Sequence, residues 1–186
     1  RGVDGFIKIK YDRYDYILPR SKVSFFTSTD GINWDIVGYP HFTGEVLKFT
    51  ENKGLIEIGG HSDGQSFGNT FLDANIKSVE IINKQNTKKI EFKEEYLNKD
   101  FYIFKPNTLQ NYNSKITFEN TGVKLFRPNK YWLAIENEYD FENDFEIIIH
   151  LSLPEVPWET QTLISNTSLF AGDSQSWKID IDDGRI

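Results

Sequence analysis

The sequence predicts an all-β fold of the sandwich or jelly-roll type, and three observations support this prediction. Short segments alternate apolar and polar residues with the period of two that a half-buried strand has. Gly, Asn, Asp and Pro separate these segments at the spacing of turns. No long window carries the 3.6-residue period of an amphipathic helix.

The first strand is predicted at residues 5–11, where apolar and mostly basic positions alternate. Its two expected faces are Ile7, Ile9 and Tyr11 on one side and Phe6, Lys8 and Lys10 on the other. Further strands are predicted at 23–27, 55–60, 76–82, 88–92, 115–119, 130–136, 145–151, 160–165 and 176–182. Residues 145–151 are almost continuously apolar, which predicts a central strand buried on both faces. Their β-branched residues disfavour a buried helix.

Two segments predict the connections between strands. Ser28-Thr29-Asp30-Gly31 ends the strand at 23–27 with a strong turn signal. Residues 98–114 carry several Asn residues, Pro106 and scattered aromatic residues without periodicity, so we interpret them as a connector.

Composition excludes several classes of function. The formal net charge of −7 and the pI of about 5.0 argue against nucleic-acid binding, which needs clustered Lys and Arg. No apolar run approaches the roughly 20 residues that span a membrane. The absence of cysteine excludes disulfides and thiolate metal sites. The absence of methionine indicates an internal fragment or a processed product.

Residues 1–97 resemble the second half of a laminin-G-like, concanavalin-type jelly-roll module found in tailed-phage virion proteins. The matching stretches are a strand, a hairpin with an S-x-DG-x-x-W pattern, a strand ending in Ile-Gly-Gly, and a last strand. They lie at 5–11, 23–34, 55–60 and 71–81.

Residues 115–186 are similar to the first half of the same module type. The matching stretches are an entry strand, a strand opened by Trp158, and a hairpin opened by Ser176-Trp177. They lie at 144–149, 158–165 and 176–184. Because the halves run in reverse order, the sequence predicts the end of one module, a connector at 98–114 and the start of the next. A permuted single module made from both halves is the alternative.

The resemblance implies a jelly-roll β-sandwich of a virion, in a fibre, a tail or a capsid decoration. We therefore expect a non-enzymatic structural or adhesion component without a cofactor. Its expected partners are other virion proteins, copies of itself in a homo-oligomer, and a host-surface glycan. The alternatives are a carbohydrate-binding module of a secreted or surface protein and a retaining β-glucanase-like glycosidase.

Two motifs suggest catalysis. Gly60-His61-Ser62-Asp63-Gly64 fits the G-x-S-x-G pattern of a hydrolase nucleophile, but the residues after it show no helical stripe. Glu138, Asp140 and Glu142 fit the E-x-D-x-E pattern of retaining β-glucanases. Asn residues flank this second motif, so we interpret it as a solvated acidic loop.

Metal binding has a weak signal. His41, His61 and His150 lack the spacing of a zinc site. Calcium is a candidate ligand of rim loops, because laminin-G-like modules sometimes bind it there. The acidic residues considered for it are Asp63, Asp73, Asp173 and Asp183.

Aromatic residues are the best binding candidates, because exposed rings stack on sugars or anchor protein interfaces. The residues predicted for this role are Tyr14, Trp34, Tyr39 and Trp158. Ser28–Trp34 also resembles the Asp-box of sialidases but is one residue short. We therefore expect Asp30-Gly31 and Trp34 to shape the hairpin.

Overall fold

A computed structural model describes residues 3–14, 19–46, 55–60, 71–84, 86–97, 99–104, 117–119, 122–126, 132–136, 141, 143–154, 159–167 and 177–181. The strands are β1 (Val3–Asp12), β2 (Lys22–Ser28), β3 (Asp35–Phe42), β4 (Leu55–Ile58), β5 (Ala74–Asn83), β6 (Thr87–Glu91), β7 (Tyr102–Phe104), β8 (Thr117–Glu119), β9 (Gly122–Leu125), β10 (Trp132–Glu136), β11 (Phe145–Leu153), β12 (Gln161–Thr167) and β13 (Trp177–Ile181). One short 3₁₀-helix, η1 (Glu94–Tyr96), follows β6.

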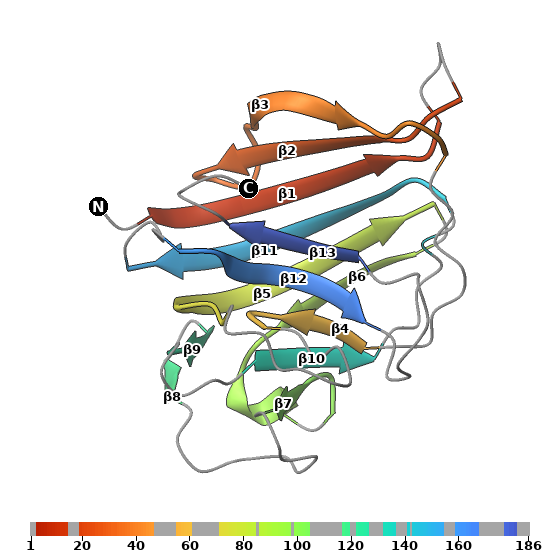
Figure 1. Ribbon diagram of the computed structural model, residues 1–186. Helices are drawn as coiled ribbons and strands as arrows, with labels where there is room; N and C mark the ends of the chain where they lie inside the picture. Colours follow the sequence, from red (N-terminus) through yellow and green to blue (C-terminus); the bar gives the residue numbers. More distant parts are fainter. Residues whose placement is uncertain are drawn as a thin grey trace.

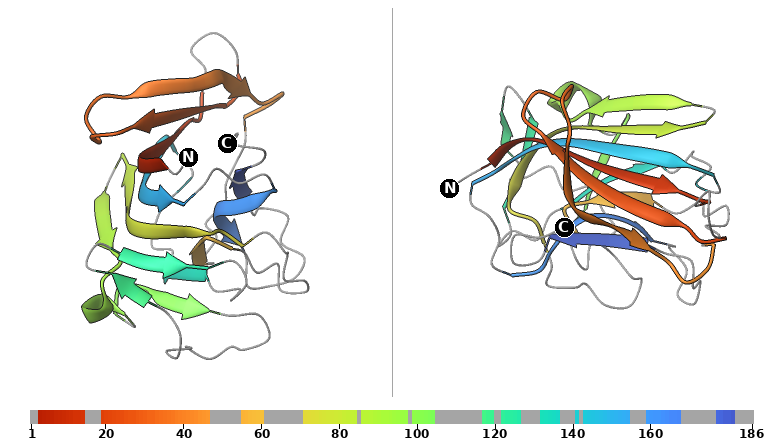
Figure 2. Two further views of the ribbon diagram at one scale, coloured as in Figure 1. Left: turned by 90° about the vertical axis from the view of Figure 1, so that its left-hand side faces the viewer. Right: turned by 90° about the horizontal axis from the view of Figure 1, so that it is seen from above.

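The strands pair into two antiparallel sheets that form a sandwich (Figure 1). Sheet A has the order β3-β2-β1-β11-β5-β9-β8, and β6 also pairs with β5. Sheet B has the order β13-β12-β4-β10-β7. Figure 2 shows the two sheets as separate layers. The predicted all-β sandwich is therefore confirmed.

The core lies between the inner faces of the two sheets. In β1, Ile7, Ile9 and Tyr11 are buried, and the residues between them are only partly buried. This alternation confirms the two faces predicted for the strand. Sheet B contributes Ile56, Ile58, Leu133, Ile135, Leu163 and Ile164 to the same core. Each aliphatic side chain of this size contributes about 1.5–3 kcal/mol when it is fully buried.

β11 corrects one prediction. It lies at the centre of sheet A, between β1 and β5, as expected for an apolar strand. However, its burial alternates along the whole strand, and Glu146, Ile148 and His150 are only partly buried. The strand is therefore buried on one face rather than two, because the other face of an antiparallel sheet is open to solvent.

The two halves of the sequence share one sandwich. β1 and β5, from residues 1–97, pair with opposite edges of β11, from residues 115–186. In sheet B, β4 from the first half lies between β12 and β10 from the second. The predicted connector at 98–114 also contributes a strand, since β7 pairs with β10.

Candidate functional site

The outer face of sheet A, which is turned away from sheet B, carries aromatic and charged side chains. In β1, Phe6 and Lys8 alternate with the buried residues and are half-buried. Phe6 is paired with Ser28 of β2 and with His150 of β11. Lys8 is paired with Phe26 of β2. Directly paired residues point to the same face of a sheet, so these side chains are neighbours.

Four side chains of this face and Trp34, from the turn before β3, form what we term the outer ring cluster: Phe6, Lys8, Phe26, Trp34 and His150. The Phe6 ring is stacked on the His150 imidazole, with ring centroids 4.0 Å apart and planes at 20°. Trp34 meets Phe6 edge-on at 6.4 Å. The Lys8 ammonium lies 4.3 Å from the Trp34 ring centroid and 4.9 Å from that of Phe26. Such contacts contribute about 0.5–1.5 kcal/mol each, so the cluster is ordered by its own members.

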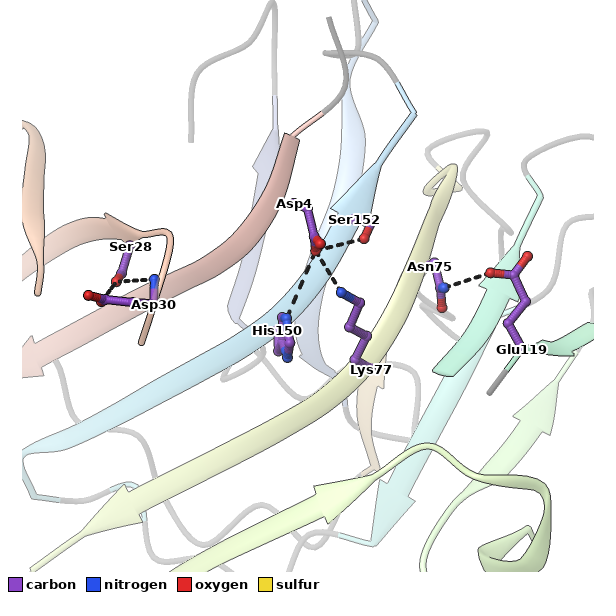
Figure 3. Close-up of polar contacts among 8 residues, drawn as sticks. All are labelled: Asp4, Ser28, Asp30, Asn75, Lys77, Glu119, His150 and Ser152. Carbon is purple, nitrogen blue, oxygen red and sulfur yellow. Dashed lines mark hydrogen bonds and ion pairs between the residues drawn. The ribbon is translucent and has the colours of Figure 1, made fainter. Parts of the chain in front are cut away.

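The turn between β2 and β3 places Trp34 in this cluster. The Ser28 hydroxyl accepts hydrogen bonds from the backbone N–H groups of Asp30 and Gly31 and donates one to the Asp30 carboxylate, at 2.9 Å (Figure 3). The backbone N–H groups of Ile32 and Asn33 donate to Asp30 Oδ1, each at 2.8 Å. These bonds, with that of Asn33 first, hold the pKa of the Asp30 carboxyl well below its usual range. The predicted hairpin turn is present and is fixed by its own side chains.

A polar network lies beside the cluster on the same face. Asp4 Oδ1 accepts hydrogen bonds from Lys77 Nζ at 2.7 Å and from Ser152 Oγ at 2.8 Å (Figure 3). These two bonds lower the pKa of Asp4. His150 Nε2 lies 3.9 Å from the same oxygen. Burial, and then the charge of Lys77, lowers the pKa of His150, so its imidazole is neutral at neutral pH.

The predicted binding residues are not gathered in one place. Trp34 belongs to the outer ring cluster, whereas Tyr39 lies on β3 and is 96% exposed. Tyr14 follows β1, is 58% exposed, and has the Arg13 guanidinium 5.3 Å from its ring centroid. Among the described residues, neither tyrosine has a ring contact with the cluster. Trp158 lies outside the described residues.

Sequence reasoning missed Phe6, Lys8 and His150 as site residues. The sequence analysis places Phe6 and Lys8 on the face opposite Ile7 and Ile9, and His150 on a strand buried on both faces. The available signal was an aromatic residue on the otherwise charged face of an alternating strand, with Asp4 and Lys8 on either side of Phe6. The contact with His150 had no local signal, because β1 and β11 are far apart in the sequence.

Most of the catalytic and metal candidates fall outside the described residues. These are Ser62, Glu138, Asp140 and Glu142 for catalysis, and Asp63, Asp173 and Asp183 for calcium. Asp73 is described, and its backbone N–H donates to Gln161 Oε1 at 2.9 Å. No group of three or more His, Asp or Glu side chains suited to a metal ion occurs among the described residues.

A shallow pocket lies at the other edge of sheet A, away from β3. Its volume is about 510 Å³, and it is lined by Lys93, Glu94, Glu95, Phe118 and Glu119, from the region of η1 and β8. The Asn75 side-chain amide donates to Glu119 Oε2 at 3.0 Å nearby (Figure 3). Three of the five side chains that line the pocket are carboxylates. The pocket is therefore mainly acidic, whereas the outer ring cluster is mainly aromatic.

Comparison with known proteins gives no match to a family model, to a curated protein or to a solved structure. Within the described part of the chain, no helix is both long enough and apolar enough to cross a lipid bilayer.

Proposed function

We propose that this chain is a non-enzymatic adhesion component that recognises its partner through the outer face of sheet A. The observation that carries the proposal is the outer ring cluster, an ordered group of aromatic rings and one lysine on the side of the sheet that the core does not use. Half-buried rings in fixed positions are efficient binding groups, because little conformational entropy is lost when a partner packs on them.

Apolar residues extend the cluster along the sheet. Ile36 of β3 is paired with Phe26 and is 52% exposed. On the other side of Lys8, Ile148 of β11 is paired with it and is half-buried. The result is a strip of side chains across β3, β2, β1 and β11 that is apolar or aromatic except for Lys8 on β1. A continuous strip of this kind on an open sheet face suits a partner that lies flat on it.

The biological setting is part of the proposal and rests on the resemblance to jelly-roll modules of tailed phages. We propose that the chain belongs to a virion, in a fibre, a tail or a capsid decoration. There it would adhere to a host-surface glycan and assemble with other virion proteins or with copies of itself.

A glycan array tests the proposal, with the wild-type chain and two variants. Trp34→Ala removes the ring that lies above Lys8, whereas Tyr39→Ala removes a ring that is more exposed but lies outside the cluster. We expect binding that is lost in Trp34→Ala and kept in Tyr39→Ala. Absence of any bound glycan, equal loss in both variants, or hydrolysis of a bound glycan would overturn the proposal.

A further inference from the structure

Lys8 differs from the other lysines of β1 and β2 in the groups that its ammonium contacts. Lys10 and Lys22 both form ion pairs with Asp12, with nitrogen–oxygen distances of 3.4 and 2.9 Å. In the part of the chain that the structure describes, Lys8 Nζ contacts the rings of Phe26 and Trp34 and no carboxylate. The outer ring cluster therefore holds a positive charge without an acidic partner from these strands.

The two rings fix the ammonium without neutralising it. A cation over an aromatic face is attracted by the ring quadrupole, but its formal charge is unchanged. The rings also displace part of the water around the ammonium, which strengthens its attraction to an added anion compared with a fully exposed lysine. Because an ammonium has three N–H donors, it can donate to an anion while it stays over the rings.

We propose that the outer ring cluster binds an acidic glycan, with an anionic group of the sugar on Lys8 and the face of a sugar ring against Trp34. This inference rests on the proposed function and names the class of its ligand. The shared chemistry is a carboxylate or a sulfate attached to a saturated ring. Such a ring presents C–H groups to an aromatic side chain and hydroxyl groups at its rim.

The groups around Lys8 favour a glycan over an acidic peptide. Peptide and protein partners are usually anchored by a side chain that fills a desolvated pocket. The described pocket of about 510 Å³ lies at the opposite edge of sheet A and is lined mainly by carboxylates. Polar groups suited to sugar hydroxyls lie near Trp34, since Asp30 and Asn33 of the turn are exposed.

The net charge of the chain sets the expected strength of this interaction. At −7, the protein repels a polyanion at long range. This repulsion is screened beyond roughly 8–10 Å at physiological salt, whereas a direct contact with Lys8 is screened less. Binding should therefore be weak and local, and it should depend on one lysine rather than on a basic surface.

Isothermal titration calorimetry with two matched pairs of probes tests the inference. The first pair is oligogalacturonate and its methyl ester, which share a sugar ring but differ in charge. The second pair is a sulfated dextran oligosaccharide and the unmodified one. The variants are Lys8→Gln, which keeps the apolar stem, Lys8→Arg, which keeps the charge, and Lys10→Gln, a neighbour already paired with Asp12.

We expect at least one acidic probe to bind, and its neutral counterpart to bind about tenfold more weakly or not at all. Lys8→Gln should weaken the binding of the acidic probe by about the same factor, tenfold. Lys8→Arg keeps the charge and should bind the acidic probe about as well as the wild-type chain, and Lys10→Gln should leave this binding nearly unchanged. The probe pair whose acidic member binds more tightly than its neutral member shows whether the site takes a carboxylate or a sulfate. Equal binding of a neutral probe, wild-type affinity in Lys8→Gln, or failure of both acidic probes to bind would overturn the inference. Neutral glycans bound on the array would still support the proposed function in that case.

Discussion

Gly31 lies against the ring of Phe6, and a Cβ atom added to this glycine would be 3.2 Å from Phe6 Cζ. The two residues are brought together because the turn after β2 folds onto the outer face of β1. The φ angle of Gly31 is +73°, in the left-handed region that other residues avoid. The turn therefore depends on this glycine twice, for its backbone conformation and for the approach to the ring.

The first prediction separates these two contributions. Gly31→Ala should lower the free energy of unfolding by about 2 kcal/mol, because it adds a left-handed alanine and a close contact with Phe6. Gly38→Ala is the matched control, since Gly38 has a φ of +66° but open space around a Cβ. It should lower the same free energy by about 1 kcal/mol. Urea denaturation measures both values, and equal losses would show that the ring contact is unimportant.

The second prediction concerns a buried hydrogen bond in sheet B. Trp132 Nε1 donates to Glu57 Oε1 at 3.0 Å, and both residues are buried. Trp132→Phe leaves a buried acceptor without this donor, which typically lowers stability by about 1–3 kcal/mol. Trp177→Phe is the control, because the Trp177 indole N–H is buried without a partner among the described residues.

Trp132→Phe should therefore lower the free energy of unfolding by about 2 kcal/mol more than Trp177→Phe does. Both substitutions remove the same atoms, and only Trp132→Phe also removes the hydrogen bond to Glu57. Thermal and urea unfolding give this difference. Similar losses in the two variants would mean that the bond to Glu57 adds no stability.

The third prediction concerns pH. The folded-state pKa of His150 is lowered from its ordinary value of 6.5, mainly by burial. Below pH 6.5 the unfolded chain therefore binds a proton at this residue more readily than the folded chain. The neutral His150 imidazole therefore contributes to the free energy of unfolding above pH 6.5. This contribution is lost as the pH falls from 6.5 through the lowered folded-state pKa.

His150→Gln should consequently flatten the fall in unfolding free energy between about pH 7 and pH 5. His41→Gln, which changes an exposed histidine of β3, is the matched comparison variant. The pKa of Asp4 is also lowered, but from 3.8, so its contribution is lost only at more acidic pH. A wild-type slope in His150→Gln would refute the assignment.

The fourth prediction follows from the interleaving of the two halves. Expressed alone, residues 1–97 lack β11, which separates β1 from β5, and lack both neighbours of β4. The fragment exposes strand edges and half of the core, so it should not unfold cooperatively. Circular dichroism should show ordered β structure only when residues 98–186 are added. Cooperative unfolding of the isolated fragment would contradict a shared core.

Local periodicity was enough to predict the fold class. In β1, the alternation of apolar and charged residues specifies both the strand and its buried face. β3 was missed because Gly38 and Pro40 are unfavourable in most strands. It tolerates both because it is an edge strand of sheet A, with a shifted register against β2. A central strand with a proline at this position would lose a ladder hydrogen bond, because proline has no backbone N–H.

The candidate site was predictable only in part. Trp34 was identified from its place after the Asp-Gly turn, a local signal. Its contacts with Phe6 and Lys8 depend on the pairing of β1 with β2, and the contact of Phe6 with His150 depends on the pairing of β1 with β11. Periodicity along one strand does not say which distant strand pairs with it. Tyr39, which was also predicted for binding, is 96% exposed and lies outside the cluster.

The most direct test of the account is two-dimensional NMR of the isotope-labelled chain, titrated with a glycan that binds on the array. Recognition by the outer face predicts that chemical-shift changes concentrate at Phe6, Lys8 and Phe26 and at the Trp34 indole N–H. Changes confined to the pocket beside η1 and β8, with none on β1 or β2, would contradict it.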